Sequence, residues 1–275
     1  NKMQATPAGS SYYSDFMTCP TKHHYAWSES LDLIEDKPAL IKGTAIHAAL
    51  NAWYTTPGNT EERMDSAVDA ILKVIDESTL QDKVVLYAQL IEVFSDYVTH
   101  WGENENNFTI IRSEIQSEIL INDAKFTFRI DQLVQSPSKE YYVLDTKTTS
   151  SKSFQQMFDD ASSGIQFPGY VYGARRITGM PVSGVIINGI RMLKNENQFD
   201  RDTRFITEAQ LAEFEALIPF LANQIKDTQS GALMRWKNRT QCQGKYGACK
   251  YDLLCNKVGD TPESRAFYRK REEPK

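Results

Sequence analysis

FRIDQLVQSPSKEYYVLDTKTTS, residues 128–150, predicts two neighbouring strands joined by a short turn. The segments Lys125–Gln135 and Tyr141–Lys147 are rich in β-branched and aromatic residues, which favour strands. Between them, Ser136-Pro137-Ser138-Lys139 has the composition of a turn. We therefore expect a β-hairpin here.

This hairpin carries two carboxylates and a lysine. Residues two apart on a strand point to the same face, so Asp145 and Lys147 project together while Thr146 points away. Asp131, on the preceding strand, reaches the same face if the register allows. Two carboxylates and a backbone carbonyl suit Mg²⁺ or Mn²⁺, and a lysine beside them can orient a water molecule, as phosphodiester hydrolysis requires. The alternative is that Asp131 merely ends a strand and that Asp145 and Lys147 form an ordinary surface ion pair.

Length and composition are those of a globular protein. The chain has 275 residues, of which 41% are hydrophobic and 24% charged, enough for one large domain or two small ones. No apolar run is long enough to span a membrane, and the opening NKMQATPAGSS lacks the apolar core of a signal peptide. We expect a cytoplasmic protein without a membrane partner.

Charge is distributed unevenly along the chain. The net charge is −5, yet residues 231–275 contain eleven Lys or Arg against five Asp or Glu. This tail therefore has a charge of +6 and residues 1–230 a charge of −11. The tail could contact a phosphate backbone or simply be a solvated basic surface.

Several helices are predicted before the hairpin. Ser14 can cap a short helix that ends before Pro20, and Gly43-Thr44 marks the start of a second helix with Ile46, Leu50 and Trp53 on its apolar face. His47 lies one position off this apolar face, where an isolated histidine is usually packed or exposed rather than a ligand. Two amphipathic helices, Glu62–Glu77 and Gln81–His100, indicate a helical subdomain over residues 55–105.

Further strands are predicted around the hairpin. Residues 111–121 alternate between apolar and polar, and Asn122-Asp123 supplies a turn into the Lys125 strand. Glu114 and Glu118 on this strand rank below the residues named above as metal ligands. A second hairpin is expected from Pro181–Leu193 and Phe199–Ile206, followed by a helix from Thr207 to about Asp227, bent at Pro219. The fold class is α/β, a mixed sheet with surrounding helices and an α-helical insertion.

Three of the four cysteines lie close together near the C-terminus. Cys242, Cys249 and Cys255 have the spacing C-x6-C-x5-C, and Cys19 lies far upstream. In a cytoplasmic protein such a cluster is more often a metal site than a set of disulfides. Soft thiolates select Zn²⁺ or an iron-sulfur cluster. The alternative is four unlinked thiols.

The order of these motifs resembles that of the RecB-type branch of the PD-(D/E)XK nuclease superfamily. The motifs are Cys19-Pro20, GTAIH ending at His47, Asp131, Asp145-x-Lys147, the Gln166-x-x-x-Tyr170 pair and the three clustered cysteines. Gln166 and Tyr170 share a face if both are helical, and Pro168 must then lie in the first turn. One departure is Phe128, where relatives often have glycine.

The resemblance implies a restriction-endonuclease-like domain over residues 1–275 with a cysteine-clamped tail over residues 231–275. By the same resemblance, the metal ligands for Mg²⁺ or Mn²⁺ would be His47, Asp131, Asp145 and the Thr146 carbonyl, and the catalytic residues Asp131, Asp145, Lys147, Gln166 and Tyr170. Cys19, Cys242, Cys249 and Cys255 would hold a 4Fe-4S cluster, favoured over Zn²⁺, as in AddB and CRISPR-adaptation nucleases. The C-x6-C spacing is wider than the C-x-x-C pair of those relatives.

The implied activity is metal-dependent exonucleolytic cleavage of single-stranded or frayed DNA ends, in phage recombination, repair or CRISPR adaptation, with DNA and proteins of those pathways as partners. The chain has no GxxxxGK[ST] loop and therefore no helicase motor of its own. The alternative function is a catalytically idle iron-sulfur subunit for DNA binding or assembly, against which the intact Asp131, Asp145 and Lys147 argue.

Overall fold

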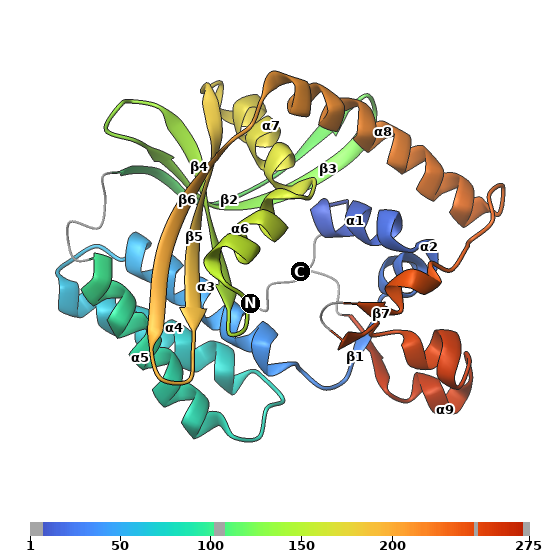
Figure 1. Cartoon of the computed structure of the whole chain (residues 1–275), viewed down its shortest axis with the longest axis horizontal. Coiled ribbons are helices and arrows are strands. Elements are labelled where there is room, and N and C mark those ends of the chain that lie inside the picture. Colours follow the sequence, from blue (N-terminus) through green and yellow to red (C-terminus); the bar gives the residue numbers. More distant parts are fainter. Residues whose placement is uncertain (1–7, 102–107, 245–246, 272–275) are drawn as a thin grey trace. The chain divides into compact units, whose positions relative to one another are not determined.

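The computed structural model describes residues 8–101, 108–244 and 247–271, which form two compact units (Figure 1). The first unit contains residues 36–119 with 128–212, and the second contains residues 8–35, 120–127 and 213–271. Strands β2 and β3 contribute residues to both units. A single domain over residues 1–275 remains our prediction, and its first seven and last four residues lie outside the described part.

A five-stranded sheet in the order β2-β3-β4-β5-β6 is the centre of the fold. Pairing is antiparallel between β3 and β4, parallel between β4 and β5, and antiparallel between β5 and β6. The sheet is therefore mixed, with helices around it, which confirms the predicted restriction-endonuclease-like class. The strands are β2 (Thr109–Ile121), β3 (Ala124–Gln135), β4 (Tyr141–Thr149), β5 (Val182–Met192) and β6 (Asn197–Phe205).

Both predicted hairpins are present, the first as β3–β4 and the second as β5–β6. In the first, the Ser136 N–H donates to the Glu140 carbonyl, and Lys139 takes a left-handed conformation (φ 68°) that closes the turn. The β2–β3 turn has two such residues, Asn122 and Asp123, with φ of 45° and 68°. Polar turn residues tolerate this conformation, which is why the sequence marks these turns correctly.

The parallel pairing of β4 with β5 requires a crossover, which two helices supply. Helices α6 (Phe154–Ser162) and α7 (Gln166–Thr178) connect these strands, and both contact β5 (Figure 1). Ser153 caps α6 by accepting from the Gln156 N–H, and Gly179 ends α7 with φ 70°. The crossover brings the start of α7 to the side chains of β4.

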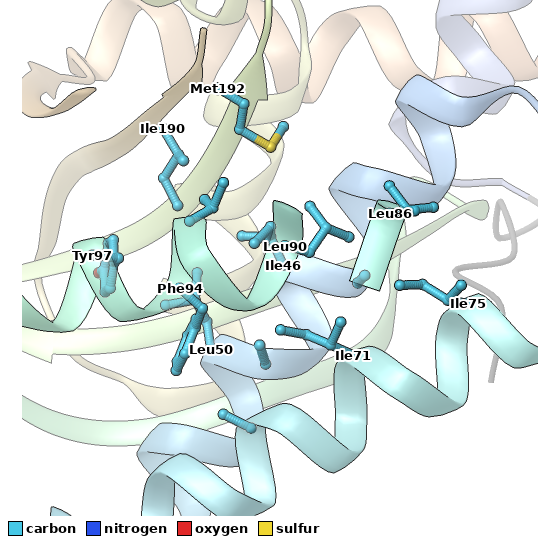
Figure 2. Close-up of a cluster of buried hydrophobic side chains, with 14 of the residues drawn as sticks. Ile46, Leu50, Ile71, Ile75, Leu86, Leu90, Phe94, Tyr97, Ile190 and Met192 are labelled. Atoms are coloured by element: carbon cyan, nitrogen blue, oxygen red, sulfur yellow. The ribbon is translucent and has the colours of Figure 1, made fainter. Parts of the chain in front are cut away.

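Three helices form a core cluster with strand β5, drawn in Figure 2. They are α3 (Pro38–Thr55), α4 (Thr60–Asp76) and α5 (Lys83–Trp101), and their apolar faces meet around Trp53, Ile71 and Phe94 together with Ile190 and Met192 of β5. Helices α4 and α5 are present where two amphipathic helices were predicted. A helical subdomain over residues 55–105 remains our prediction, and residues 102–105 lie outside the described part. An Asn59–Glu62 capping box starts α4.

Two predicted helix starts were wrong. Helix α3 begins at Pro38 rather than at Gly43-Thr44, because a proline in the first turn needs no N–H partner and Lys37 before it is extended. Ser14 is inside α1 (Ser10–Thr18), whose N-cap is Gly9. The predicted end of α1 before Pro20 is confirmed, since Cys19 is extended between α1 and α2.

The second unit pairs segments from the two ends of the sequence. Leu31–Leu33 (β1) is antiparallel to Tyr268–Lys270 (β9), over a core that includes Tyr25, Tyr251 and Leu254. The long helix α8 (Glu208–Ser230), of which residues 213–230 belong to this unit, continues through Pro219. The smaller elements are α2 (Pro20–His23), β7 (Gln243–Gly244), β8 (Gly247–Ala248), α9 (Pro262–Arg265), two π-helical turns (His24–Ser28 and Leu253–Lys257) and one 3₁₀ turn (Arg239–Gln241).

We expect His23 in this unit to make stability depend on pH. Its ring packs edge-on against Tyr12 and Phe16, and its buried Nε2 has no hydrogen-bond partner among the described residues. Burial lowers the pKa of His23 from 6.5 to about 4. The unfolded chain then binds one more proton than the folded chain between these pH values, so stability is full above pH 6.5 and falls as the pH drops to 4. We expect His23 to account for a loss of about 3 kcal/mol.

The measurement is urea unfolding at pH 7 and pH 4 for the wild type and His23→Gln, which cannot titrate. The variant should lose less stability than the wild type over this range by about 3 kcal/mol. An equal loss in both proteins would mean that His23 carries no proton-linked stability.

No helix in the described part of the chain is both long enough and apolar enough to span a bilayer.

Candidate active site

The register of the first hairpin brings the two aspartates together. The β3–β4 pairs run from Gln135–Tyr141 to Gln132–Leu144, so one further step would place Asp131 opposite Asp145. At that step a side-chain hydrogen bond joins the two strands: Asp131 Oδ2 accepts from the Thr146 N–H at 3.0 Å. Asp131 is therefore fixed to the backbone of the residue between Asp145 and Lys147.

Helix α3 brings His47 to the same place. His47 Nδ1 lies 3.1 Å from Asp131 Oδ2, and both side chains are mostly buried. One turn earlier, Gly43 faces β4, where a β-carbon would lie 3.2 Å from Thr148 Oγ1. A glycine at this position thus lets the helix approach β4 closely, and the four-residue spacing puts His47 on the same side of the helix.

Lys147 links β4 to helix α7. Its Nζ lies 2.8 Å from Asp145 Oδ2 and donates a hydrogen bond to Gln166 Oε1 at 3.0 Å. Gln166 Nε2 in turn donates to the Tyr170 hydroxyl at 2.7 Å. The oxygen and the nitrogen of the Gln166 amide thus hold the lysine and the phenol. Asp145, Lys147, Gln166 and Tyr170 form a continuous row of contacts.

The local structure of α7 explains this row. Gln166 is the first residue of the helix, after the cap residue Ile165, and Pro168 lies in the first turn, where its missing N–H costs nothing. Gly173 contributes further along, because a β-carbon there would lie 2.5 Å from the Phe128 ring. The bulky residue at 128, where the RecB-type pattern often has glycine, is therefore accommodated by a glycine on the helix.

The charges at the site are arranged in two pairs. Burial by itself would lower the pKa of His47, but the charge and hydrogen bond of Asp131 outweigh burial and raise it. Burial likewise opposes ionisation of Asp131, whose pKa is nevertheless lowered by His47 and by the Thr146 N–H. Burial and the neighbouring Asp131 raise the pKa of Asp145, against the opposing effect of Lys147. Two neighbouring buried carboxylates repel each other and favour cations, and here His47 and Lys147 supply the positive charges.

The donor atoms fit a divalent cation chemically. They are two carboxylates, an imidazole and a backbone carbonyl, mostly the hard oxygen ligands that Mg²⁺ and Mn²⁺ prefer. Asp145 Oδ2 is buried and, among the described residues, accepts no hydrogen bond of good geometry despite its proximity to Lys147. In the described part of the chain, however, no three His, Cys, Asp or Glu side chains stand as a ready-made metal site. His47 and Lys147 instead hold the two carboxylates in ion pairs.

A buried polar network on the other side of β4 was not predicted from the sequence. Asn188 of β5 is fully buried, and its Nδ2 donates to Thr146 Oγ1 at 3.2 Å and to the Tyr97 hydroxyl at 3.1 Å. Arg201 of β6 donates from Nε to Asn188 Oδ1 at 3.1 Å, and its guanidinium lies 3.9 Å from the centre of the Trp101 ring. The hydrogen bond from Asn188 therefore fixes the side chain of Thr146.

The secondary candidates are not part of the row. Glu114 and Glu118 lie on β2, from which β4 is separated by β3. Arg175 of α7 donates to the Val182 carbonyl and pairs with Glu208 at 2.8 Å. The row around Lys147 thus consists of the residues ranked first.

The four cysteines all lie in the second unit and are free thiols. The Cys249 N–H donates to the Cys242 carbonyl at 2.9 Å, which closes the loop between them. Burial raises the pKa of the Cys249 thiol, and the nearby Cys19 and Cys242 raise it further. The thiols are thus neighbours, but no three of these described residues are arranged to bind a metal ion. Residues 245 and 246, inside the loop, lie outside the described part.

Comparison with known proteins gives the family. Residues 10–256 match the PD-(D/E)XK nuclease superfamily, and the chain belongs to it. Its members are nucleases that typically use divalent metals such as Mg²⁺. No curated protein matches the chain.

Two solved structures are similar to the chain. A candidate exonuclease from Eubacterium rectale is 15% identical, with a TM-score of 0.55 over 93% of this chain and 100% of that protein. The protein SSO0001 is 16% identical, with a TM-score of 0.33 over 78% of this chain and 84% of that protein. At this identity, the first likeness supports the fold alone.

Proposed function

We propose that this protein is a metal-dependent DNA exonuclease of the RecB type, which hydrolyses phosphodiester bonds at single-stranded or frayed ends. The observation that carries the proposal is the row from Asp145 through Lys147 and Gln166 to Tyr170, together with Asp131, which the Thr146 N–H holds in place. Recombination, repair or CRISPR adaptation in the cytoplasm is the proposed setting.

In this proposal His47, Asp131, Asp145 and the Thr146 carbonyl hold one or two Mg²⁺ or Mn²⁺ ions. Bound there, the ions supply positive charge beside the scissile phosphate and make a bound water more acidic. For the metal ions to bind, Asp145 has to replace part of its contact with Lys147 by a bond to the metal. The hydrogen bond from the Thr146 N–H keeps Asp131 in place during this exchange.

Lys147 orients the attacking water and stabilises the charge that develops on the phosphate. Its Nζ is positioned by Asp145 on one side and by Gln166 Oε1 on the other, so the amine is fixed before substrate arrives. Burial raises the pKa of Tyr170 well above its usual range, so its hydroxyl stays neutral and can donate to a phosphate oxygen.

The test is digestion of end-labelled single-stranded and duplex DNA by anaerobically purified protein with Mg²⁺, Mn²⁺ or EDTA. We expect cleavage that requires the added metal and releases nucleotides progressively from one end, and the position of the label gives the polarity. Absence of cleavage of either form in both metals would instead favour an idle DNA-binding or assembly subunit.

We also propose that Cys19, Cys242, Cys249 and Cys255 bind a 4Fe-4S cluster. Four free thiols in one unit support this, as does the resemblance of their order to RecB-type nucleases. Cluster formation requires some of the four thiols to move, because no three of them are arranged as a metal site in the described part of the chain. Cys249→Ser should then remove the iron and the visible absorption of purified protein and lower its melting temperature.

The measurement is an iron and sulfide assay with an absorption spectrum, and Met17→Ser, an exposed residue of the same unit, is the control. Zinc in place of iron would correct the metal, whereas metal-free wild type with the same melting temperature as Cys249→Ser would exclude a cluster.

A further inference from the structure

Residues 233–239, LMRWKNR, form an exposed segment after helix α8, here called the basic-aromatic segment. Trp236 is 43% exposed and Met234 is 79% exposed, although both are large apolar side chains. Arg235, Lys237 and Arg239 alternate with them. Large exposed apolar groups are unfavourable in water and commonly mark a binding surface.

The backbone of the basic-aromatic segment is fixed, so its exposure is built into the unit. The Trp236 carbonyl accepts a hydrogen bond from Thr21 Oγ1 at 2.9 Å. The Asn238 N–H donates to Cys19 Sγ at 3.3 Å, and Asn238 Nδ2 donates to the Thr18 carbonyl at 2.9 Å. These bonds tie the segment to the junction of α1 and α2 through its main chain and leave the indole outside.

The positive charges of the segment are not neutralised. Lys237 Nζ donates to the Cys255 carbonyl at 2.9 Å, and Arg239 Nη1 lies 3.4 Å from Asn256 Oδ1. Both acceptors are uncharged, and in the described part of the chain no carboxylate pairs with Arg235, Lys237 or Arg239. Each cation is therefore available to an anionic partner.

We infer that the basic-aromatic segment binds single-stranded DNA, with the Trp236 indole stacked on a base and the three cations beside phosphates. The inference deepens the proposed nuclease function and rests on it for the choice of DNA. An aromatic ring between cations matches the alternation of bases and phosphates along a strand. Stacking requires the free face of an unpaired base, so the segment favours single strands over duplex.

Binding is measured by fluorescence anisotropy of a dye-labelled oligothymidylate in EDTA, where no cleavage occurs. Trp236→Ala should weaken binding about tenfold, and Trp236→Phe should recover part of the loss. Phe220→Ala is the matched control, because Phe220 is an aromatic residue of the same unit that is 58% exposed but has no cationic neighbours in sequence. It should bind as the wild type does.

The cations are tested by the dependence of binding on salt. Lys237→Gln and Arg239→Gln should each reduce the slope of log K against log salt by about 0.7, whereas Trp236→Ala should leave the slope unchanged. Equal affinity of Trp236→Ala and wild type for oligothymidylate would overturn the inference. If Trp236→Ala lost as much affinity for duplex DNA as for oligothymidylate, the preference for single strands would be overturned.

Binding in EDTA separates this inference from the nuclease proposal. If the wild type binds DNA through Trp236 but cleaves no DNA when metal is added, only the proposed activity is disproved. If the wild type cleaves DNA but Trp236→Ala binds DNA as well as the wild type does, only the role of the segment is disproved.

Discussion

Lys147→Ala is expected to reduce metal-dependent DNA cleavage about a thousandfold, the effect of removing a fixed charge from a transition state. The amine lies between Asp145 and Gln166, so no other cation of the row replaces it. Initial rates of label release from single-stranded DNA in saturating Mn²⁺ measure the effect. The fold should persist, since the Lys147 side chain is 27% exposed and the backbone pairing of β4 is unchanged.

The matched control is Lys152→Ala, which removes another half-buried lysine that is ion-paired with an aspartate, Asp160. Its cleavage rate should stay within a few-fold of the wild type. Asp145→Asn, of the same shape as the native residue, should be as inactive as Lys147→Ala because it loses a charged metal ligand. Wild-type rates in both site variants would disprove the site assignment.

Asn188→Leu is expected to destabilise the protein by about 4 kcal/mol, since it removes the acceptor of the half-buried Arg201 and the donor to two buried hydroxyls. It should also raise the Mg²⁺ concentration for half-maximal cleavage about tenfold, as loss of an outer-shell contact does. The reason is geometric, because Asn188 holds Thr146, whose N–H fixes Asp131. Urea unfolding and Mg²⁺ titration of the cleavage rate measure the two effects.

Asn188→Asp is the conservative comparison, because it keeps an acceptor for Arg201 and the hydroxyls of Thr146 and Tyr97 can donate to it. Its Mg²⁺ requirement should lie near that of the wild type. A destabilised Asn188→Leu variant with an unchanged Mg²⁺ requirement would mean that Asn188 serves only the core and does not position the site.

Local chemistry made much of the fold predictable from the sequence. Turn residues at 122–123 and 136–139 marked two hairpin turns, and the period of two placed Asp145 and Lys147 on one face. The GTAIH glycine has a physical basis in the close approach of α3 to β4, which explains why Gly43 and His47 occur together. The helix starts were less predictable, because several residues before Gly43 can cap a helix and only tertiary packing selects among them.

The network behind β4 was not predictable in the same way. Asn188 interrupts an apolar strand, and this interruption is a signal that some buried polar partner exists. Its partners Thr146, Tyr97 and Arg201 are 42, 91 and 13 residues away, and no periodic pattern connects them. Only the strand order and the packing of α5 bring them together.

The pairing of Leu31–Leu33 with Tyr268–Lys270 has a consequence for biosynthesis. A ribosome makes a chain from its N-terminus, so strand β1 emerges more than 200 residues before its partner β9. The first unit contains all its segments by residue 212 and can begin to fold while translation continues. The second unit cannot be completed until β9 has been made. Until then the apolar residues around Tyr25 stay exposed, and their burial requires slow closure of a long loop, during which a chaperone can shield them.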